Sequence, residues 1–264
     1  MPDFTAKDVQ RLRQSTGVGM ADAKRALDAN DGDFDAAVKW LRTEGLTSSA
    51  KLSGRDASQG SVAAVRDGAV AAIVSLRCET DFVAKSAEFV TLVDEIAARV
   101  AADGESAVDS FADEIERLRV TLKENISIGS VVRLEAKDGQ LVDTYVHVQD
   151  GRGINAVAIV LEGGTEELAH DVAVHVAFTK PAYLSRDDVP ADEVAAERAT
   201  IEEISRKEGK PEAALPKIIE GRLTGWFKDR VLLEQDYVRD EKQSIAKLLG
   251  SATIVSFAQV LIGS

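Results

Sequence analysis

The chain has 264 residues, 45% hydrophobic and 29% charged, a composition that is ordinary for globular proteins and excludes disorder throughout. Its formal net charge of -13, without a basic stripe, argues against a nucleic-acid binder, because phosphate recognition needs clustered Lys and Arg. The single cysteine, Cys78, cannot form an internal disulfide, and neither an apolar leader nor a run long enough to span a membrane is found. These features predict a cytoplasmic protein.

The N-terminal part has the pattern of three short helices between residues 5 and 45. The segment Gly17-Val18-Gly19 is expected to break the first helix from the second, and Gly45 is expected to end the third. We therefore predict an N-terminal three-helix domain over residues 1–46. The small and polar residues 47–60 are predicted to form a linker, in which a helical turn is also compatible with the pattern.

Strand patterns follow the linker. The stretch SVAAVRDGAVAAIVSLR predicts a hairpin that turns at Asp67-Gly68, and further turns are expected at Asp138-Gly139 and Asp150-Gly151. Between them, one amphipathic helix is expected from about Asp81 to Ala102. Its predicted inward stripe is Phe82, Phe89, Val93, Ile96 and Val100.

Two stretches of the chain share one order of elements. "GAVAAIVSLRCETDFVAKSAEFVTLVDEIAARVAA" and "GINAVAIVLEGGTEELAHDVAVHVAF" each predict a hairpin strand followed by an amphipathic helix. We interpret this as a degenerate internal duplication of an antiparallel sheet covered by helices, which makes the fold class α+β. The predicted divisions are a core subdomain N over residues 61–140 and a core subdomain C over residues 141–189 and 230–264.

Residues 190–229 have a different pattern. A helix is expected to begin at Pro190, with inward positions Val194, Ile201 and Ile204, and Gly209-Lys210-Pro211 breaks it. The next helix shows a stripe of Leu215, Ile218, Arg222, Leu223 and Trp226. Two helices joined by three residues must run antiparallel, so a coiled-coil hairpin is predicted here, with helix (SIAKLLG) and strand (TIVSFAQVLI) patterns after it.

Motifs for catalysis are missing. His170 and His175 are five residues apart and do not form an i, i+4 metal pair, and with one cysteine a zinc site is not expected. No phosphate-binding glycine loop and no Gly-x-Ser-x-Gly element is present. The sequence therefore favours a binding protein over an enzyme, with no cofactor and no metal.

One short stretch, CETDFVAK at residues 78–85, raises a question about its aromatic residue. In one interpretation Thr80 is an N-cap, Asp81 a first-turn acid that suits the helix dipole, and Phe82 a core residue. In the other, Asp81 and Phe82 project together from the junction between strand and helix and contact another protein, as exposed aromatics often do at interfaces. The residue pattern leaves both interpretations open.

Four stretches resemble one family. "TDFVAKSAEF" at 80–89 resembles the signature of bacterial translation elongation factor Ts, and "LRQSTGVGMADAKRALDANDGDFDAAVKWLRTEGL" at 12–46 is similar to that family's N-terminal ubiquitin-associated-like (UBA-like) bundle. "HVAFTKPAYL" at 175–184 and "LLEQDYVRD" at 232–240 match in place and order. The resemblance implies an N-terminal UBA-like bundle, two related α+β subdomains and a protruding antiparallel helical hairpin.

The resemblance also implies a function. The family is the guanine nucleotide exchange factor for elongation factor Tu, a GTPase of translation elongation, so the expected partner is that GTPase and neither nucleic acid nor membrane. The family's wedge, which dislodges Mg²⁺ from the partner, maps onto Thr80, Asp81, Phe82 and Val83. The surface of the N-terminal bundle that docks on the partner maps onto Leu12, Val18, Gly19 and Met20.

A third contact region is implied near the C-terminus, at Tyr237 and Val238. There the chain departs from its family, which often has Pro-Phe-Val where this sequence has Asp236-Tyr237-Val238. An alternative function is a polypeptide-binding adaptor that uses the UBA-like bundle without exchange activity, since a fold does not dictate a function. A cofactor-dependent enzyme is the third class, which a bound chromophore or metal would reveal.

Overall fold

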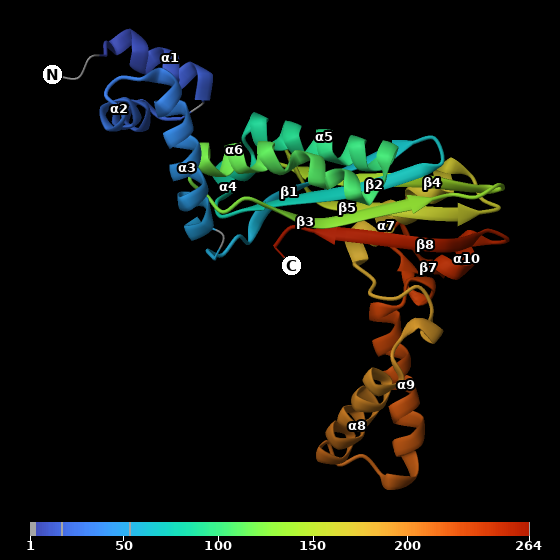
Figure 1. The fold of residues 1–264 in the computed structure, drawn as a ribbon. Helices are drawn as coiled ribbons and strands as arrows, with labels where there is room; N and C mark the ends of the chain where they lie inside the picture. Colours follow the sequence, from blue (N-terminus) through green and yellow to red (C-terminus); the bar gives the residue numbers. More distant parts are fainter. Residues whose placement is uncertain (1–3, 17, 53, 264) are drawn as a thin grey trace.

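The computed structural model describes residues 4–16, 18–52 and 54–263, with the backbone alone for residues 45–51. At one end of the molecule, helices α1 (Ala6–Thr16), α2 (Met20–Ala29) and α3 (Phe34–Leu52) pack into a bundle (Figure 1). Leu12 and Leu27 are completely buried at its centre. The break predicted between the first two helices is confirmed by their bounds, although Gly17 lies outside the described residues.

The prediction that Gly45 ends the third helix is wrong. Helix α3 continues to Leu52, which leaves only a short connection before the first strand begins at Gln59. A glycine inside a helix costs roughly 1 kcal/mol relative to alanine, which weakens a helix without stopping it, and no proline follows. Residues 47–52 of the segment predicted as a linker are therefore helical, and α3 extends from the bundle towards the core (Figure 1).

The core contains two antiparallel sheets. The first has the order β1-β2-β3, formed by β1 (Gln59–Asp67), β2 (Val70–Cys78) and β3 (Ser127–Glu135). The second has the order β4-β5-β8, formed by β4 (Gln140–Gln149), β5 (Arg152–Glu162) and β8 (Thr253–Leu261). One apolar cluster lies between the two sheets and includes Val62 and Ile73 of the first with Val142 and Val160 of the second. The sheets therefore pack face to face.

Helices cover the outer faces of both sheets (Figure 1). Helix α5 (Ala87–Asp103) packs on the first sheet, with α6 (Ala112–Leu122) beside it after a 3₁₀ turn at Glu105–Phe111. Helix α7 (Glu166–Thr179) packs on the second sheet. The core therefore has four layers, helix-sheet-sheet-helix, each interface filled by its own apolar cluster.

The two halves of the core repeat one arrangement, as the sequence predicts. In each, a hairpin leads into helical structure, and a later strand pairs antiparallel with the second strand of the hairpin. The turn at Asp150-Gly151 has positive φ at both residues, which is the geometry of a tight hairpin turn. The turn at Asp138-Gly139 instead connects the two sheets, and the first hairpin turns at Gly68-Ala69, one residue later than expected.

A long excursion separates α7 from β8. Helices α8 (Ala191–Lys207) and α9 (Leu215–Arg230) form the predicted antiparallel hairpin, which projects away from the core (Figure 1). The remaining elements are 3₁₀ turns at Arg186–Asp188, Glu212–Ala214 and Leu232–Glu234, strands β6 (Asp236–Tyr237) and β7 (Asp240–Ser244), and α10 (Ile245–Leu249). The helix and strand predicted after the hairpin are confirmed as α10 and β8.

The predicted stripes of this hairpin need correction. The buried residues of α9 are Leu215, Ile219, Leu223 and Phe227, spaced by four, in place of the predicted Ile218, Arg222 and Trp226. On α8, Ile201 is buried, whereas the predicted Ile204 is 44% exposed. The buried side chains of α9 thus lie along one i, i+4 ridge of the helix, whereas the predicted stripe assumed a spacing close to 3.5 residues. No helix among the described residues is both long enough and apolar enough to cross a bilayer.

Candidate functional site

The strand-helix junction at residues 78–86 shows why the aromatic Phe82 is not a core residue. The predicted single helix is broken: α4 (Asp81–Ala84) is one turn, and α5 starts after a new N-cap, Ser86, whose Oγ accepts the N–H of Phe89. The break removes Phe82 from the inward stripe of α5. The prediction that Phe82 points inward is therefore wrong, and its side chain is 74% exposed.

The single turn of α4 is capped at its start. Thr80 has extended backbone angles, and its Oγ1 accepts the N–H of Val83 at 3.3 Å, as an N-cap does. Val83 packs against the cluster between α5 and the first sheet, and Ala84 is fully buried there. One side of this turn is thus attached to the core, while Phe82 projects from the other side.

The side chain of Lys85 contacts both Asp81 and the exposed Phe82. Its Nζ lies 3.0 Å from Oδ2 of Asp81 and 4.7 Å from the centre of the Phe82 ring. The hydrogen bond from Lys85 lowers the pKa of Asp81, so the carboxylate stays ionised well below neutral pH. An acid and an aromatic ring are therefore held side by side on the surface by one ammonium group.

A second set of contacts attaches the start of this turn to the loop after α6. Oε2 of Glu124 accepts the backbone N–H groups of Glu79 and Thr80, each at 3.1 Å, and its Oε1 accepts the hydroxyl of Thr80. In return, Oε1 of Glu79 accepts the backbone N–H of Asn125 at 2.7 Å. Each loop thus supplies a carboxylate to the backbone of the other, which is a strong, charge-assisted arrangement.

Beneath the junction lies Cys78. Its side chain is fully buried, and burial raises the pKa of the thiol to about 12, with the Glu124 carboxylate acting in the same direction. A thiol with this pKa is protonated at neutral pH and is a weak nucleophile. The role of Cys78 is therefore packing, with Sγ 3.2 Å from the carbonyl oxygen of Thr80.

The residues implied in the N-terminal bundle do not form one surface. Leu12 is completely buried and Val18 is 7% exposed, so both stabilise the bundle. Gly19 is exposed, and Met20 is 49% exposed at the first position of α2. Correcting the predicted set, Gly19 and Met20 are available to a partner, whereas Leu12 is not.

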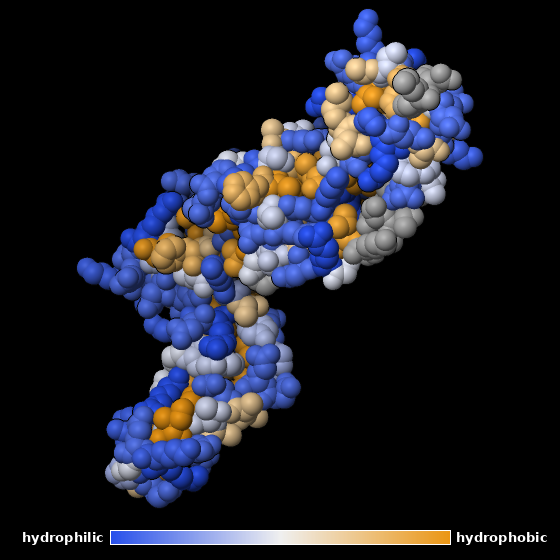
Figure 2. Space-filling view, turned by 90° about the vertical axis from the view of Figure 1, so that its left-hand side faces the viewer, coloured by the Kyte–Doolittle hydropathy of each residue, from blue (hydrophilic) through white to orange (hydrophobic). Residues whose placement is uncertain are grey.

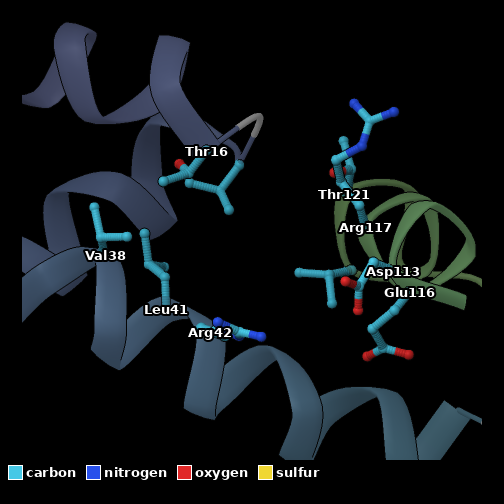
Figure 3. Close-up of a pocket in the computed structure, with 10 residues that line it drawn as sticks. Thr16, Val38, Leu41, Arg42, Asp113, Glu116, Arg117 and Thr121 are labelled. Atoms are coloured by element: carbon cyan, nitrogen blue, oxygen red, sulfur yellow. The ribbon is translucent and has the colours of Figure 1, made fainter.

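A cleft of about 440 Å³ lies between the bundle and α6. Figure 3 shows side chains of the bundle, among them Val38 and Leu41 of α3, facing those of α6 across the gap. Its walls combine Val18 and Val120 with charged groups such as Arg117. At one point the two parts are joined directly, where Nζ of Lys123 lies 2.9 Å from Oδ2 of Asp22.

The predicted contact loop near the C-terminus is held against α7. Tyr237 is 5% exposed and Val238 is half-buried, so Tyr237 offers little surface, contrary to the prediction. The fully buried His175 fastens this loop: its Nδ1 accepts the N–H of Val238 at 3.3 Å, and its Nε2 pairs with Oε1 of Gln235 at 3.0 Å. Burial lowers the pKa of His175, which favours the neutral ring required by these bonds.

Sequence reasoning missed two residues that contact the strand-helix junction, Lys85 and Glu124. Lys85 could have been found, because it follows Asp81 by four residues and therefore shares a helix face with it. Glu124 had no such signal, since it is 44 residues from Thr80 and only the fold brings the two together. In the described part of the chain, no three His, Cys, Asp or Glu side chains group as a metal site would require.

The surface of the molecule on the side of α4 has both hydrophobic and hydrophilic areas. Figure 2 views the side on which α4 lies in Figure 1 and shows hydrophobic residues across the middle of the core, surrounded by hydrophilic ones. The exposed large hydrophobic side chains of the described residues include Phe82 and, on α7, Phe178 at 76%. Phe82 differs in lying beside the Lys85–Asp81 ion pair, and an exposed aromatic next to charged groups is typical of a protein-protein contact.

Comparisons with known proteins agree on one family. A family model described as Elongation factor TS matches residues 79–264. The protein named Elongation factor Ts of Clavibacter michiganensis subsp. michiganensis is 44% identical over 278 residues, covering all of both chains. That of Mycobacterium marinum is 45% identical over 273 residues, covering all of this chain and 99% of its own, and that of Micrococcus luteus is 38% identical over the full length of both.

Proposed function

Because the chain belongs to the elongation factor Ts family, we propose that it promotes nucleotide exchange on elongation factor Tu by inserting residues 80–83 beside the nucleotide of that GTPase. The family supports the coarser statement, a guanine nucleotide exchange factor in translation elongation. One observation carries the finer one: Phe82 is 74% exposed on a turn whose base is fastened to the core. We call Thr80, Asp81, Phe82 and Val83 the wedge.

The chemistry of the wedge follows from what holds a guanine nucleotide. Mg²⁺ requires near-ideal octahedral coordination and bridges phosphate oxygens, so small displacements of its surroundings weaken both metal and phosphate binding. In this proposal the Phe82 ring enters an apolar pocket of the partner, and the ionised Asp81 disturbs the groups that hold the metal. Each ~1.4 kcal/mol removed from the dissociation barrier accelerates GDP release about tenfold.

Exchange by this mechanism is reversible. Factor and nucleotide oppose each other on the partner, and thermodynamic linkage makes the weakening mutual. GTP then refills the empty site and displaces the factor. This chain forms and breaks no covalent bond in the process and needs no cofactor of its own.

A second contact would come from the N-terminal bundle. Gly19 and Met20 present their exposed atoms at the start of α2, while Val18 is buried behind them and lines one wall of the cleft that faces α6. Near the C-terminus, Val238 remains the candidate contact, with Tyr237 packed behind it. These surfaces would supply affinity, while the wedge supplies the displacement of Mg²⁺.

The test measures release of a fluorescent GDP analogue from purified elongation factor Tu. Asp81→Ala and Phe82→Ala are expected to slow the stimulated release at least tenfold, because they remove the groups that act at the metal site. Phe178→Ala is the matched control, since it removes a Phe that is equally exposed but lies on α7, and it should leave the rate unchanged. Wild-type rates in both wedge variants, with folding intact, would contradict the mechanism.

A further inference from the structure

The carboxylate of Glu124 connects the start of the wedge to the loop after α6. Helix α6 ends at Leu122, and Lys123 adopts a left-handed conformation with φ 58° that turns the chain towards the junction. Glu124 comes next and accepts three hydrogen bonds, two from the backbone of Glu79 and Thr80 and one from the Thr80 hydroxyl. One side chain therefore anchors the first residue of the wedge and the residue before it.

The connection is reciprocal, which makes it stiff. Oε1 of Glu79 accepts the backbone N–H of Asn125, and its Oε2 lies 2.6 Å from Nη2 of Arg55. The side-chain amide of Asn125 donates to the carbonyl oxygen of Arg55 at 2.7 Å. Three segments that are far apart in sequence thus meet directly behind the wedge.

A single helical turn needs such support. Four residues cannot hold a helix by themselves, because nucleation costs more than one turn of hydrogen bonds returns. The direction in which Phe82 projects is therefore set by its attachments. Atoms that are already fixed before docking avoid the entropy cost of ordering during it, and so more of the contact energy reaches the metal site.

We propose that Glu124 is a positioning residue for nucleotide exchange: it fixes the backbone of Glu79 and Thr80, so that Asp81 and Phe82 approach the GTPase in one orientation. This inference rests on the proposed function, because it assumes that the wedge acts on the partner. Glu124 acts through the wedge and touches neither nucleotide nor metal. Its loss should lower the maximal rate of exchange more than it weakens binding.

The experiment compares Glu124→Ala, Glu124→Gln and the control Glu114→Ala, an exposed acid on α6. In Glu124→Ala, GDP release at saturating factor should fall about tenfold, while the half-saturating concentration changes less, because other surfaces still bind. Glu124→Gln should recover most of the rate, since its amide oxygen can accept both backbone N–H groups and its nitrogen can donate to Thr80. Glu114→Ala should behave as wild type.

A second measurement reports the anchor itself. Amide hydrogen exchange at Glu79 and Thr80 should accelerate in Glu124→Ala and stay slow in Glu124→Gln, while the amides of β5 remain protected in both. A wild-type exchange rate in Glu124→Ala, with Phe82→Ala inactive, would overturn the inference alone. A wild-type rate in Phe82→Ala would overturn the proposed function and, with it, this role of Glu124.

Discussion

The ammonium nitrogen of Lys85 lies 4.7 Å from the centre of the Phe82 ring. The same nitrogen is 3.0 Å from the carboxylate of Asp81, which precedes Lys85 by four residues, about one helical turn. The contact covers part of an aromatic side chain that would otherwise stand free in water, and it restricts the rotamers of three neighbouring residues at once. The exposed ring is therefore partly ordered before any partner arrives.

This relationship predicts the effect of removing the charge at residue 85. Lys85→Met keeps the length of the side chain but loses both contacts, and should reduce the maximal rate of GDP release about two- to fivefold. Lys85→Arg retains a cation that stacks on the ring and pairs with the acid, and should stay near wild type. Stimulated GDP release checks both variants. Equal rates for Lys85→Met, Lys85→Arg and wild type would show that the contacts of Lys85 with Asp81 and Phe82 do not affect exchange.

The buried histidine predicts a loss of stability in mild acid. Burial lowers the pKa of His175 in the folded chain, so below the unfolded value of about 6.5 the unfolded state binds a proton that the folded state does not. Stability is therefore complete above that pH and falls as the pH drops towards the folded pKa, by at most about 1.4 kcal/mol per pH unit from this residue.

Urea unfolding between pH 7 and 5.5 measures this dependence. His175→Gln should flatten the profile, and His147→Gln, which changes an exposed histidine, should leave it as in wild type. A profile of unchanged slope in His175→Gln would assign the acid sensitivity to other groups.

Two glycines of α9 predict a gain in stability. A Cβ added at Gly221 or Gly225 meets no atom within 4 Å, and both residues are exposed in the interior of the helix. Replacing each by alanine should raise the free energy of unfolding by about 1 kcal/mol, because glycine loses more backbone entropy on folding. Thermal or urea unfolding gives the change directly.

Gly153 is the contrasting control for those substitutions. A Cβ there would lie 2.0 Å from the carbonyl oxygen of Val62, at the close approach of the two sheets. Gly153→Ala should therefore destabilise the protein by roughly 1–3 kcal/mol through overpacking. Should Gly153→Ala prove harmless, the sheets do not approach so closely at this point.

The thiol of Cys78 should be almost unreactive in the folded protein. With a pKa raised to about 12, its thiolate fraction at pH 8 is about three orders of magnitude below that of a free cysteine, and the sulfur is also buried. A disulfide reagent should therefore label the native protein only as fast as it unfolds or opens locally, and the denatured protein at once. Rapid stoichiometric labelling of the native chain would contradict the buried position.

Much of the fold could be predicted from local patterns. The three N-terminal helices, the strands with their Asp-Gly turns, the repeated order of elements and the helical hairpin all leave periodic signals in the sequence. The predicted ends of elements were less accurate, since α3 continues past Gly45. The predicted buried side of α9 was also inaccurate, because Phe227 is buried in place of Trp226. A glycine is a weak stop signal, and which side of a helix is buried depends on what packs against it.

The hydrophobic periodicity wrongly predicted a buried Phe82, which is exposed in the structure. Phe82 and Phe89 are seven residues apart, a spacing that favours one continuous helix with both rings inward. Ser86 can cap a new helix, but nothing local decides that it does so. The attachment of Thr80 to Glu124 holds the start of α4, and the burial of Ala84 holds its last residue against the core. Distant contacts therefore outweighed the periodicity.

The amino-acid sequence by itself determined the classes of element, their order, the duplication and the family, because these depend on residue periodicity and on motifs that are contiguous in the chain. Only the tertiary structure decided which side chains are free to meet a partner: Phe82 and Met20 are exposed, whereas Leu12 and Tyr237 are buried. Whether an apolar side chain is exposed cannot be deduced from local sequence, because its burial depends on segments that the fold brings to it from far along the chain.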